Sequence, residues 1–319
     1  MKNYGEFDFI ANIRRMFAEL PKSDFEGIGD DCSVLPMGDE ALVFTADMLN
    51  EGIHFLTERS TAYQIGYKSL MVNISDVAAM GAKPVATLLS LALPEERFGE
   101  WSDEFMRGYY EASARYNVAL VGGDTTKSNY GVGINVTAIG RVAKANIKRR
   151  SAAKIGDVIA VTGRLGASAA GLRDVLNGVC NTENAKIHLM PEAQVREGEW
   201  FGAQCAVHAM MDVSDGIASD MRHILDESKV SAVIAENDIP VAEGATLEDA
   251  LCGGEDYQLL LTIDERKAIS LAKEFHDRFG KPLYIIGRVV ESNNRWDKLC
   301  FEDANGVLHC SDIAGYSHF

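Results

Sequence analysis

Signatures of several common protein classes are missing from this 319-residue sequence. None of its six cysteines forms a C-x-x-C pair, which argues against a zinc site and against a dense disulfide framework. No run approaches the roughly 18 apolar residues of a membrane span. Residues 1–10 also lack the apolar core of a signal peptide. These absences predict a protein of the reducing cytoplasm without a membrane partner.

The usual nucleotide and hydrolase motifs are missing as well. Segment 122–128, GGDTTKS, resembles a P-loop, but that motif requires glycine at position 126, where the chain has threonine. No G-x-G-x-x-G opens a helix after a strand in the dinucleotide-binding manner. The nucleophile elbow G-x-S-x-G is also absent.

Basic residues are in the minority. The chain has 31 basic and 47 acidic residues, a formal net charge of -16. This charge argues against a general nucleic-acid or anionic-membrane binder, because basic side chains would have to act locally against a repulsive field. It does not exclude phosphate substrates if metal ions supply positive charge.

Length and pattern predict two domains. Apolar runs typical of strands alternate with segments of helical spacing, which predicts an α/β (α+β) fold. One of these runs, Val85 to Leu93, is predicted to be a strand buried on both faces. Residues 144–154 are basic and small, and we interpret them first as a solvated linker and second as a phosphate contact. The predicted domains are therefore residues 1–148 and 149–319.

Three short phrases recur in the same order in both halves. They are Ser75-Asp76 with Ser214-Asp215, Gly122-Gly123-Asp124 with Gly253-Gly254-Glu255, and Ile139 to Val142 with Ile286 to Val289. Duplication and coincidence remain open as explanations, and both are compatible with two units.

Candidate chemistry centres on aspartates. Segment 61–80 has helical periodicity, and Asp76 lies among its apolar residues. A buried carboxylate there is costly unless something pairs with it. Similar aspartates stand beside glycine or serine at predicted strand ends or helix starts, namely Asp30, Asp31, Asp47, Asp124, Asp212 and Asp215. Carboxylates from several segments suit Mg²⁺ that bridges phosphates, although any single one of them also suits a helix cap or a turn.

Other candidates have ordinary structural alternatives. A lone histidine such as His54 is more often packed or hydrogen-bonded than catalytic. Cys32 stands beside two acids, which predicts a packed thiol. Arg141 and Arg288 suit either a phosphate or an ion-pair partner.

Seven motifs, in order along nearly the whole chain, resemble the thiamine-monophosphate kinase family. They are Gly27 to Cys32, Thr45 to Asp47 with Gly52 to Phe55, Asn73 to Gly81, Gly122 to Thr126, Asp212 to Gly216, Gly253 to Tyr257, and Gly315 to Phe319. The resemblance implies the two-domain fold of aminoimidazole ribonucleotide synthetase-like proteins. It also implies a homodimer in which strands of the N-terminal domains build a shared barrel.

The implied reaction transfers a phosphoryl group from ATP to thiamine monophosphate, giving thiamine diphosphate, by direct in-line transfer assisted by several Mg²⁺ ions. The resemblance implies metal binding by Asp31, Thr45, Ala46, Asp47, Asp76, Asp124, Asp212 and Asp215. It implies ATP binding by Gly123, Asp124, Arg141 and Ser214, and substrate binding by His54, Glu255 and Tyr316. No residue is assigned as catalytic beyond the metal ligands.

The sequence departs from the family pattern in places. Ala46 stands where threonine is common, so only its backbone can bind metal, and Ile53 replaces a frequent asparagine beside His54. Two alternative functions remain: another ATP-dependent synthetase of the same superfamily, or a non-enzymatic nucleotide- or metal-binding protein.

Overall fold

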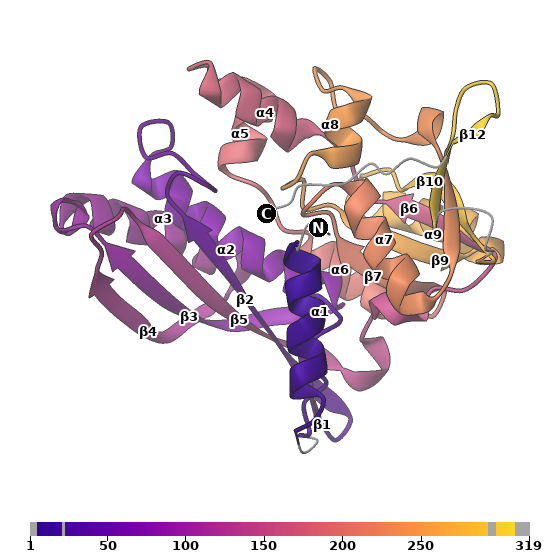
Figure 1. Ribbon diagram of the computed structural model, residues 1–319, viewed down its shortest axis with the longest axis horizontal. Coiled ribbons are helices and arrows are strands. Elements are labelled where there is room, and N and C mark those ends of the chain that lie inside the picture. The colour runs from indigo at the N-terminus through magenta and orange to yellow at the C-terminus, as the bar shows by residue number, and fades with distance from the viewer. Residues whose placement is uncertain (1–4, 21–22, 293–297, 310–319) are drawn as a thin grey trace.

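The computed structural model describes residues 5–20, 23–292 and 298–309. The chain forms two α/β units, each built on its own sheet (Figure 1). All strands of the first sheet lie within residues 33–143, and all strands of the second lie within 157–309. The predicted two-domain α/β class is thus confirmed.

The first sheet has five strands in the order β1-β2-β5-β3-β4. Neighbouring strands are antiparallel except β3 and β4, which are parallel. The strands are β1 Ser33–Met37, β2 Glu40–Asn50, β3 Lys83–Leu93, β4 Ala119–Lys127 and β5 Gly133–Ala143, and two helices, α2 Ala62–Ala79 and α3 Glu100–Tyr116, cover one face.

The other face of this sheet is open. In β2, Val43 packs beneath α2, while Met48 on the opposite face is 57% exposed. In β3, Leu89 is buried but Leu88 is 39% exposed, and every residue of β4 is exposed. The expectation that residues 85–93 are buried on both faces is therefore wrong for a single chain, because nothing in it covers the second face.

Helix α2 is the central element of the molecule. Its start is fixed by Thr61, whose hydroxyl accepts a hydrogen bond from the Gln64 amide at 3.2 Å while the Gln64 side chain accepts one from the Thr61 amide at 2.9 Å. Most of the helix is buried. Gly66 lets it approach α3 closely, because a Cβ there would lie 2.0 Å from the carbonyl oxygen of Phe105.

The second sheet has seven strands in the order β12-β11-β8-β10-β6-β9-β7. The strands are β6 Asp157–Val161, β7 Val207–Asp212, β8 Ser231–Ala235, β9 Leu259–Asp264, β10 Tyr284–Val290, β11 Leu299–Glu302 and β12 Leu308–His309. The helices of this unit are α4 Ala167–Leu176, α5 Glu183–Leu189, α6 Val195–Gly202, α7 Ile217–Ser228, α8 Leu247–Cys252 and α9 Glu265–Phe279.

Both faces of the second sheet are covered. Ile159 and Val161 of β6 belong to the core under α7, whereas Ala160 between them belongs to the core under α6 and α9. This alternation is the side-chain pattern of a strand that lies between two helical layers.

The two domains meet at the C-terminal end of α2. Ala79 of α2 shares a hydrophobic core with Phe201 of α6 and Met210 of β7. A Cβ on Gly198 would lie 2.3 Å from the carbonyl oxygen of Ala78, so α6 approaches the helix as closely as a glycine permits. The same helix therefore carries residues of the first domain into contact with the second.

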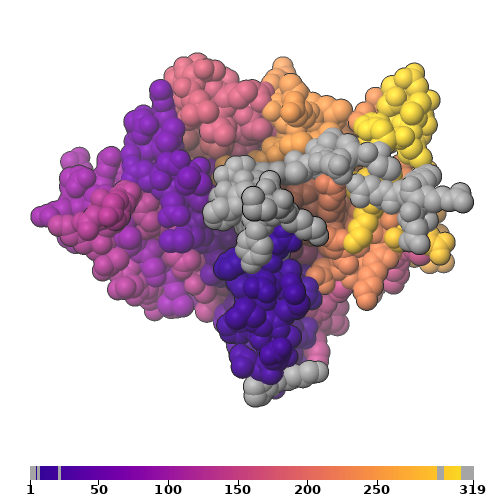
Figure 2. Space-filling model, in the orientation of Figure 1, coloured from indigo at the N-terminus to yellow at the C-terminus, as the bar shows by residue number. Residues whose placement is uncertain are grey.

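Helix α1, Glu6–Phe17, lies across the junction on the front face of the molecule (Figures 1 and 2). Its Arg14 forms an ion pair of 2.6 Å with Glu227 of α7. Met16 and Phe17 are each 61% exposed. Among the described residues, no helix combines the length and apolar character needed to cross a bilayer.

Candidate active site

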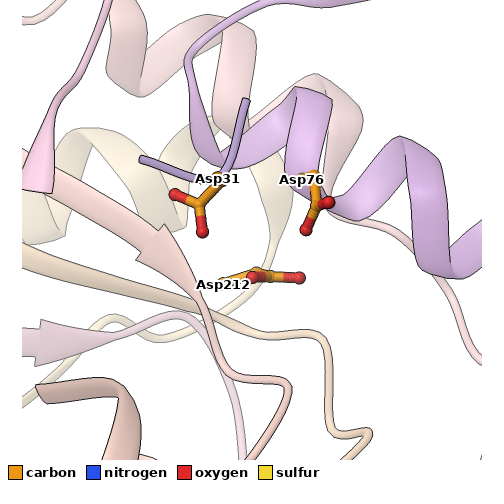
Figure 3. Close-up of side chains that lie close together, drawn as sticks. All are labelled: Asp31, Asp76 and Asp212. Carbon is orange, nitrogen blue, oxygen red and sulfur yellow. The ribbon is translucent and has the colours of Figure 1, made fainter. Parts of the chain in front are cut away.

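Three carboxylates from distant parts of the chain converge between the domains (Figure 3). Asp31 precedes β1, Asp76 lies in the last turns of α2, and Asp212 is the last residue of β7. Each offers an oxygen, and these oxygens all lie within 4.8 Å of one another. The cluster therefore joins two segments of the first domain to one of the second.

Each of these carboxylates is fixed by a neighbour. The hydroxyl of Thr45 donates to Asp76 Oδ2, that of Ser75 donates to Asp212 Oδ2, and Arg150 Nη2 donates to Asp31 Oδ1, each at 2.5 Å. The remaining oxygen of Asp31, Oδ2, is buried without a hydrogen-bond partner among the described residues. A buried, unpartnered carboxylate oxygen is the kind of donor atom that a hard cation takes.

Burial and mutual repulsion make full ionisation of the cluster costly. Burial, with Asp31 nearby, raises the pKa of Asp212 to about 8. Burial, with Asp47 and Asp212 nearby, raises the pKa of Asp76 well above its usual range. Arg150 adds a single positive charge. A divalent cation between these groups would supply the missing countercharge, so the donor set fits a metal ion.

Two further predicted ligands border the cluster. Asp47 lies in β2, and its backbone amide donates to Asn73 Oδ1 of α2 at 3.0 Å. Burial and the neighbouring Asp215 raise the pKa of Asp47 to about 6. Asp215 lies in the loop before α7, where its amide donates to Asp220 Oδ2 at 3.3 Å. Both aspartates line the same cavity as Asp76.

This cavity has a volume of about 770 Å³ and lies between the domains. It brings together the predicted metal, ATP and substrate residues Asp47, Asp76, Ser214, Asp215, His54 and Glu255. The rest of its wall includes apolar side chains of β2 and the following loop and of α4, among them Phe55, Leu172 and Leu176. The cavity therefore has an acidic part and a part suited to an organic ring system.

Two of the three predicted substrate residues, His54 and Glu255, are held by backbone contacts. His54 Nδ1 accepts a hydrogen bond from the Asn50 amide at 3.0 Å. Glu255 has a positive φ of 65°, which is unusual for a residue with a side chain. Its amide donates to the Ser214 carbonyl at 2.8 Å, so the loop that carries Glu255 lies directly against the predicted ATP-binding residue.

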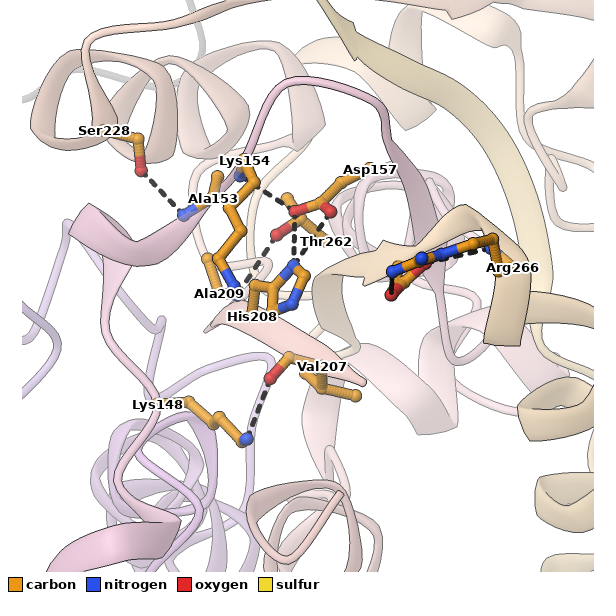
Figure 4. Close-up of polar contacts among 11 residues, drawn as sticks. Lys148, Ala153, Lys154, Asp157, Val207, His208, Ala209, Ser228, Thr262 and Arg266 are labelled. Atoms are coloured by element: carbon orange, nitrogen blue, oxygen red, sulfur yellow. Dashed lines mark hydrogen bonds and ion pairs between the residues drawn. The ribbon is translucent and has the colours of Figure 1, made fainter. Parts of the chain in front are cut away.

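The connection between the domains corrects one interpretation. Residues 144–154 were expected to be a solvated linker, but Lys148 is 6% exposed and donates to the carbonyl of Val207 at 2.8 Å (Figure 4). The Ala153 amide donates to Ser228 Oγ at 3.0 Å. Arg150, in the same segment, reaches Asp31. The expectation is wrong because these basic side chains pair with carbonyls and carboxylates at the domain seam. The predicted boundary between 148 and 149 falls inside this segment.

Some site residues were not identified from the sequence. Arg150 was assigned to the linker, and Lys68 of α2, 4% exposed, was not considered, although it pairs with Glu255 at 2.7 Å. His188 of α5 also lines the cavity. A lysine inside an apolar helical stretch is the one signal that could have drawn attention to Lys68.

Several predicted residues lie away from the cluster in this chain. Asp124 and Gly123 are in the exposed edge strand β4, and the register places Asp124 three strands from β2, about 14 Å at the usual spacing. Arg141 lies on the open face of β5 and pairs with Glu40 at 3.0 Å. Ala46, in contrast, lines the same cavity as Asp47 and Asp76. Tyr316 is outside the described residues.

Comparison with known proteins agrees with this architecture. Residues 29–142 match the family described as AIR synthase related protein, N-terminal domain, and residues 154–295 match the corresponding C-terminal domain. Thiamine-monophosphate kinase of Buchnera aphidicola subsp. Acyrthosiphon pisum is 36% identical over 331 residues, covering 99% of both chains. The enzyme of Escherichia coli K12 is 34% identical, covering 99% of this chain and 98% of its own. The chain belongs to the thiamine-monophosphate kinase family.

Solved structures in the thiamine-monophosphate kinase family share the fold. The structure described as AaThiL complexed with AMPPCP and TMP superimposes with a TM-score of 0.84 at 31% identity, covering 100% of this chain and 98% of that one. Thiamine-monophosphate kinase from Stenotrophomonas maltophilia K279a gives a TM-score of 0.75 at 34% identity, covering 93% and 96%. Hydrogenase maturation protein HypE in complex with ATP gives 0.74 at 18% identity, covering 99% and 98%, a likeness of fold alone.

Proposed function

We propose that this chain transfers the terminal phosphoryl group of ATP to thiamine monophosphate, forming thiamine diphosphate and ADP. The observation that carries the proposal is the carboxylate cluster of Asp31, Asp76 and Asp212, which borders a cavity large enough for an organic phosphate. Support comes from the relatives named as thiamine-monophosphate kinases. The similar structure complexed with AMPPCP and TMP supports it further.

The metal in this proposal is Mg²⁺, as several ions. The residues that would hold it are Asp31, Thr45, Asp47, Asp76, Asp212 and Asp215, whose oxygens are the hard ligands that Mg²⁺ takes. When bound, the ions neutralise phosphate charge and stabilise the group in transfer. The buried, unpartnered Oδ2 of Asp31 supports this assignment.

The protein's part in the reaction is to bind and orient two anions. The acceptor phosphate has a second pKa of ~6 and is largely deprotonated at neutral pH, so its oxygen attacks without a strong general base. Glu255 and His54, which line the same cavity, orient the organic portion of the acceptor. The domain seam at α2 holds both parts in fixed relation, which favours direct in-line attack.

We also propose a homodimer in which a second copy completes the site. The predicted ATP contacts Gly123, Asp124 and Arg141 lie on the open side of the first sheet, away from the cluster of their own chain. An uncovered sheet face with an exposed edge strand is a surface that favours pairing. Two such sheets facing each other would form the predicted barrel and bring these residues toward the partner's cavity.

The proposed setting is the cytoplasm, with small-molecule partners and neither nucleic acid nor membrane among them. The alternatives are a sibling synthetase and a non-enzymatic binding protein. A sibling that uses a reactive cysteine is not favoured, because burial and the neighbouring carboxylates raise the pKa of Cys32 well above its usual range.

The test supplies purified protein with Mg²⁺, ATP labelled at the γ-phosphate and thiamine monophosphate, and separates the products by chromatography. Label in thiamine diphosphate, in equal amount to ADP, supports the proposal. Label only in inorganic phosphate would indicate a synthetase-like reaction, and unchanged ATP with measurable ATP binding would indicate a binding protein.

A further inference from the structure

A buried ionic network stands behind the organic part of the cavity. Lys68 Nζ lies 2.7 Å from Glu255 Oε2, and His188 Nδ1 lies 3.4 Å from the same oxygen. Ser168 Oγ lies 2.9 Å from His188 Nδ1. The Lys68 side chain is 5% exposed and the Glu255 side chain 26%, so the lysine is enclosed and the carboxylate reaches the cavity.

The loop that carries Glu255 is held in a strained conformation. Both Glu255 and Tyr257 have positive φ, at 65° and 49°. Their amides donate to the carbonyls of Ser214 and Val213, each at 2.8 Å. Asp256 between them accepts hydrogen bonds from the Gly166 amide at 2.5 Å and the Ser168 amide at 3.1 Å. Strain maintained by this many contacts is typical of a functional position.

The charge balance keeps Glu255 an acceptor. Burial opposes its ionisation, but the Lys68 ammonium outweighs that effect and holds the pKa of Glu255 below the usual range. Burial together with Lys68 lowers the pKa of His188 to about 4, so the imidazole is neutral near pH 7. Both contacts use Oε2, and among the described residues Oε1 is left to accept a hydrogen bond from a ligand in the cavity.

We propose that Lys68 and His188 are positioning residues for substrate selection: they fix the Glu255 carboxylate so that Oε1 accepts a hydrogen bond from the exocyclic amine of the substrate's pyrimidine ring. This inference rests on the proposed function and concerns the organic part of the acceptor, not the phosphates. Lys68 does not line the cavity and acts through Glu255.

Helix α2 links this network to the phosphate end. Lys68 and Ser75 are seven residues, or two turns, apart on the same side of the helix, about 10 Å along its axis. Ser75 binds Asp212 of β7, and Lys68 binds Glu255 of the loop before β9. Both contacts cross from the first domain to the second. One rigid helix therefore sets the distance between the carboxylate cluster, where the phosphates would bind, and Glu255, where the ring would bind.

The test compares two acceptors, thiamine monophosphate and oxythiamine monophosphate, in which an oxo group replaces the amine. A site built to accept that hydrogen bond should favour the amine in kcat/KM by about 10²-fold or more. In Lys68→Met this preference should fall by about tenfold or more, while the KM for ATP stays within about twofold. His188→Gln should lower the preference in the same direction.

A double-mutant cycle separates positioning from general damage. If Lys68 acts through Glu255, the Lys68→Met, Glu255→Gln double variant should be no more impaired than Glu255→Gln alone. Arg115→Met is the matched control, because it removes another ion pair across the domains, with Glu192 at 2.5 Å, where both side chains are about half exposed. It should leave the preference for the amine unchanged.

The outcomes are distinct. Equal losses for both acceptors in Lys68→Met, with the preference retained, would overturn the positioning role while leaving the proposed reaction intact. If Lys68→Met does not fold, the ratio of kcat/KM for the two acceptors is measured in His188→Gln and Glu255→Gln instead, and the same criterion applies. Absence of any transfer to thiamine monophosphate by the wild-type protein would overturn the proposed function itself.

Discussion

Ser75 donates a hydrogen bond of 2.5 Å from its hydroxyl to the carboxylate of Asp212, joining α2 of the first domain to the end of β7 in the second. The next residue of the helix, Asp76, presents its own carboxylate to the same cluster. Two adjacent residues of α2 thus reach the cluster: Ser75 fixes the carboxylate of Asp212, and Asp76 contributes its own carboxylate. The spacing of carboxylates between domains is therefore set by one turn of α2.

Ser75→Ala should weaken both the domain seam and the reaction. Ser75 is the hydrogen-bond partner of a buried carboxyl group, and leaving such a group unsatisfied costs about 1–3 kcal/mol. We expect the free energy of unfolding to fall by about 2 kcal/mol in denaturant titration. Activity should fall with it, because Asp212 is no longer fixed. Ser270→Ala, on the exposed side of α9, is the control, and equal effects of the two substitutions would contradict this role of Ser75.

Asp212→Asn should stabilise the metal-free protein. Burial, then Asp31, raises the folded-state pKa of Asp212 to about 8, against an ordinary value of 3.8. The folded state therefore holds a proton that the unfolded state releases, and stability falls as pH rises from about 4 to about 8. Removing the charge should raise the free energy of unfolding at pH 8 by about 2 kcal/mol or more, with no gain at pH 4.

The same variant should lose its response to metal. Wild-type protein should show a higher Tm on adding Mg²⁺, since a ligand that binds the folded state stabilises it. Asp212→Asn should show a smaller rise and no turnover. A variant that is less stable than wild type without metal, yet still stabilised equally by Mg²⁺, would contradict the assignment of Asp212 as a ligand.

His188 should make stability fall at acidic pH. Burial, then Lys68, lowers its folded-state pKa to about 4 from 6.5. Below pH 6.5 the unfolded chain takes up a proton that the buried imidazole refuses, so this contribution is lost as pH falls toward 4. Between pH 7 and pH 4, the free energy of unfolding of the wild type should fall by up to about 3 kcal/mol more than that of His188→Gln. If the free energies of unfolding of the two proteins, measured in urea, changed in parallel with pH, this contribution of His188 would be contradicted.

Mixing two inactive variants should restore activity if a second copy completes the site. Asp76→Asn damages the cluster and Asp124→Asn the predicted ATP contact on the open sheet. In a heterodimer, one site would carry both substitutions and the other neither. After unfolding and joint refolding, about a quarter of wild-type activity should return. No recovery, with heterodimers present by mass spectrometry, would place both residues in one site of one chain.

How much the sequence could predict is visible in the aspartates. Asp76 was placed correctly on a helix because the period of residues 61–80 and the C-terminal Gly81 are local signals. Asp31, Asp76 and Asp212 were grouped through the family resemblance, and the structure brings their carboxylates together. Spacing along the chain carries no such information, because it does not determine which segments meet in space.

The errors have a common physical origin. The apolar pattern of residues 85–93 predicts burial on both faces, but burial depends on what covers the sheet, and a single chain leaves one face open. The basic composition of residues 144–154 predicts a solvated linker, yet Lys148 and Arg150 are held at the domain seam by carbonyl and carboxylate partners distant in sequence. Lys68 was missed for the same reason, since Glu255 lies 187 residues away.

The most direct test of the central claim is the turnover of Asp76→Asn at saturating Mg²⁺, measured as thiamine diphosphate formed from ATP and thiamine monophosphate. Asp103→Asn, an exposed aspartate of α3, is the matched control. The account predicts a folded protein whose turnover is lower than wild type by about 10³-fold or more, with the control unaffected. Near-normal turnover by Asp76→Asn would contradict the claim that these buried carboxylates hold the metal at which phosphoryl transfer takes place.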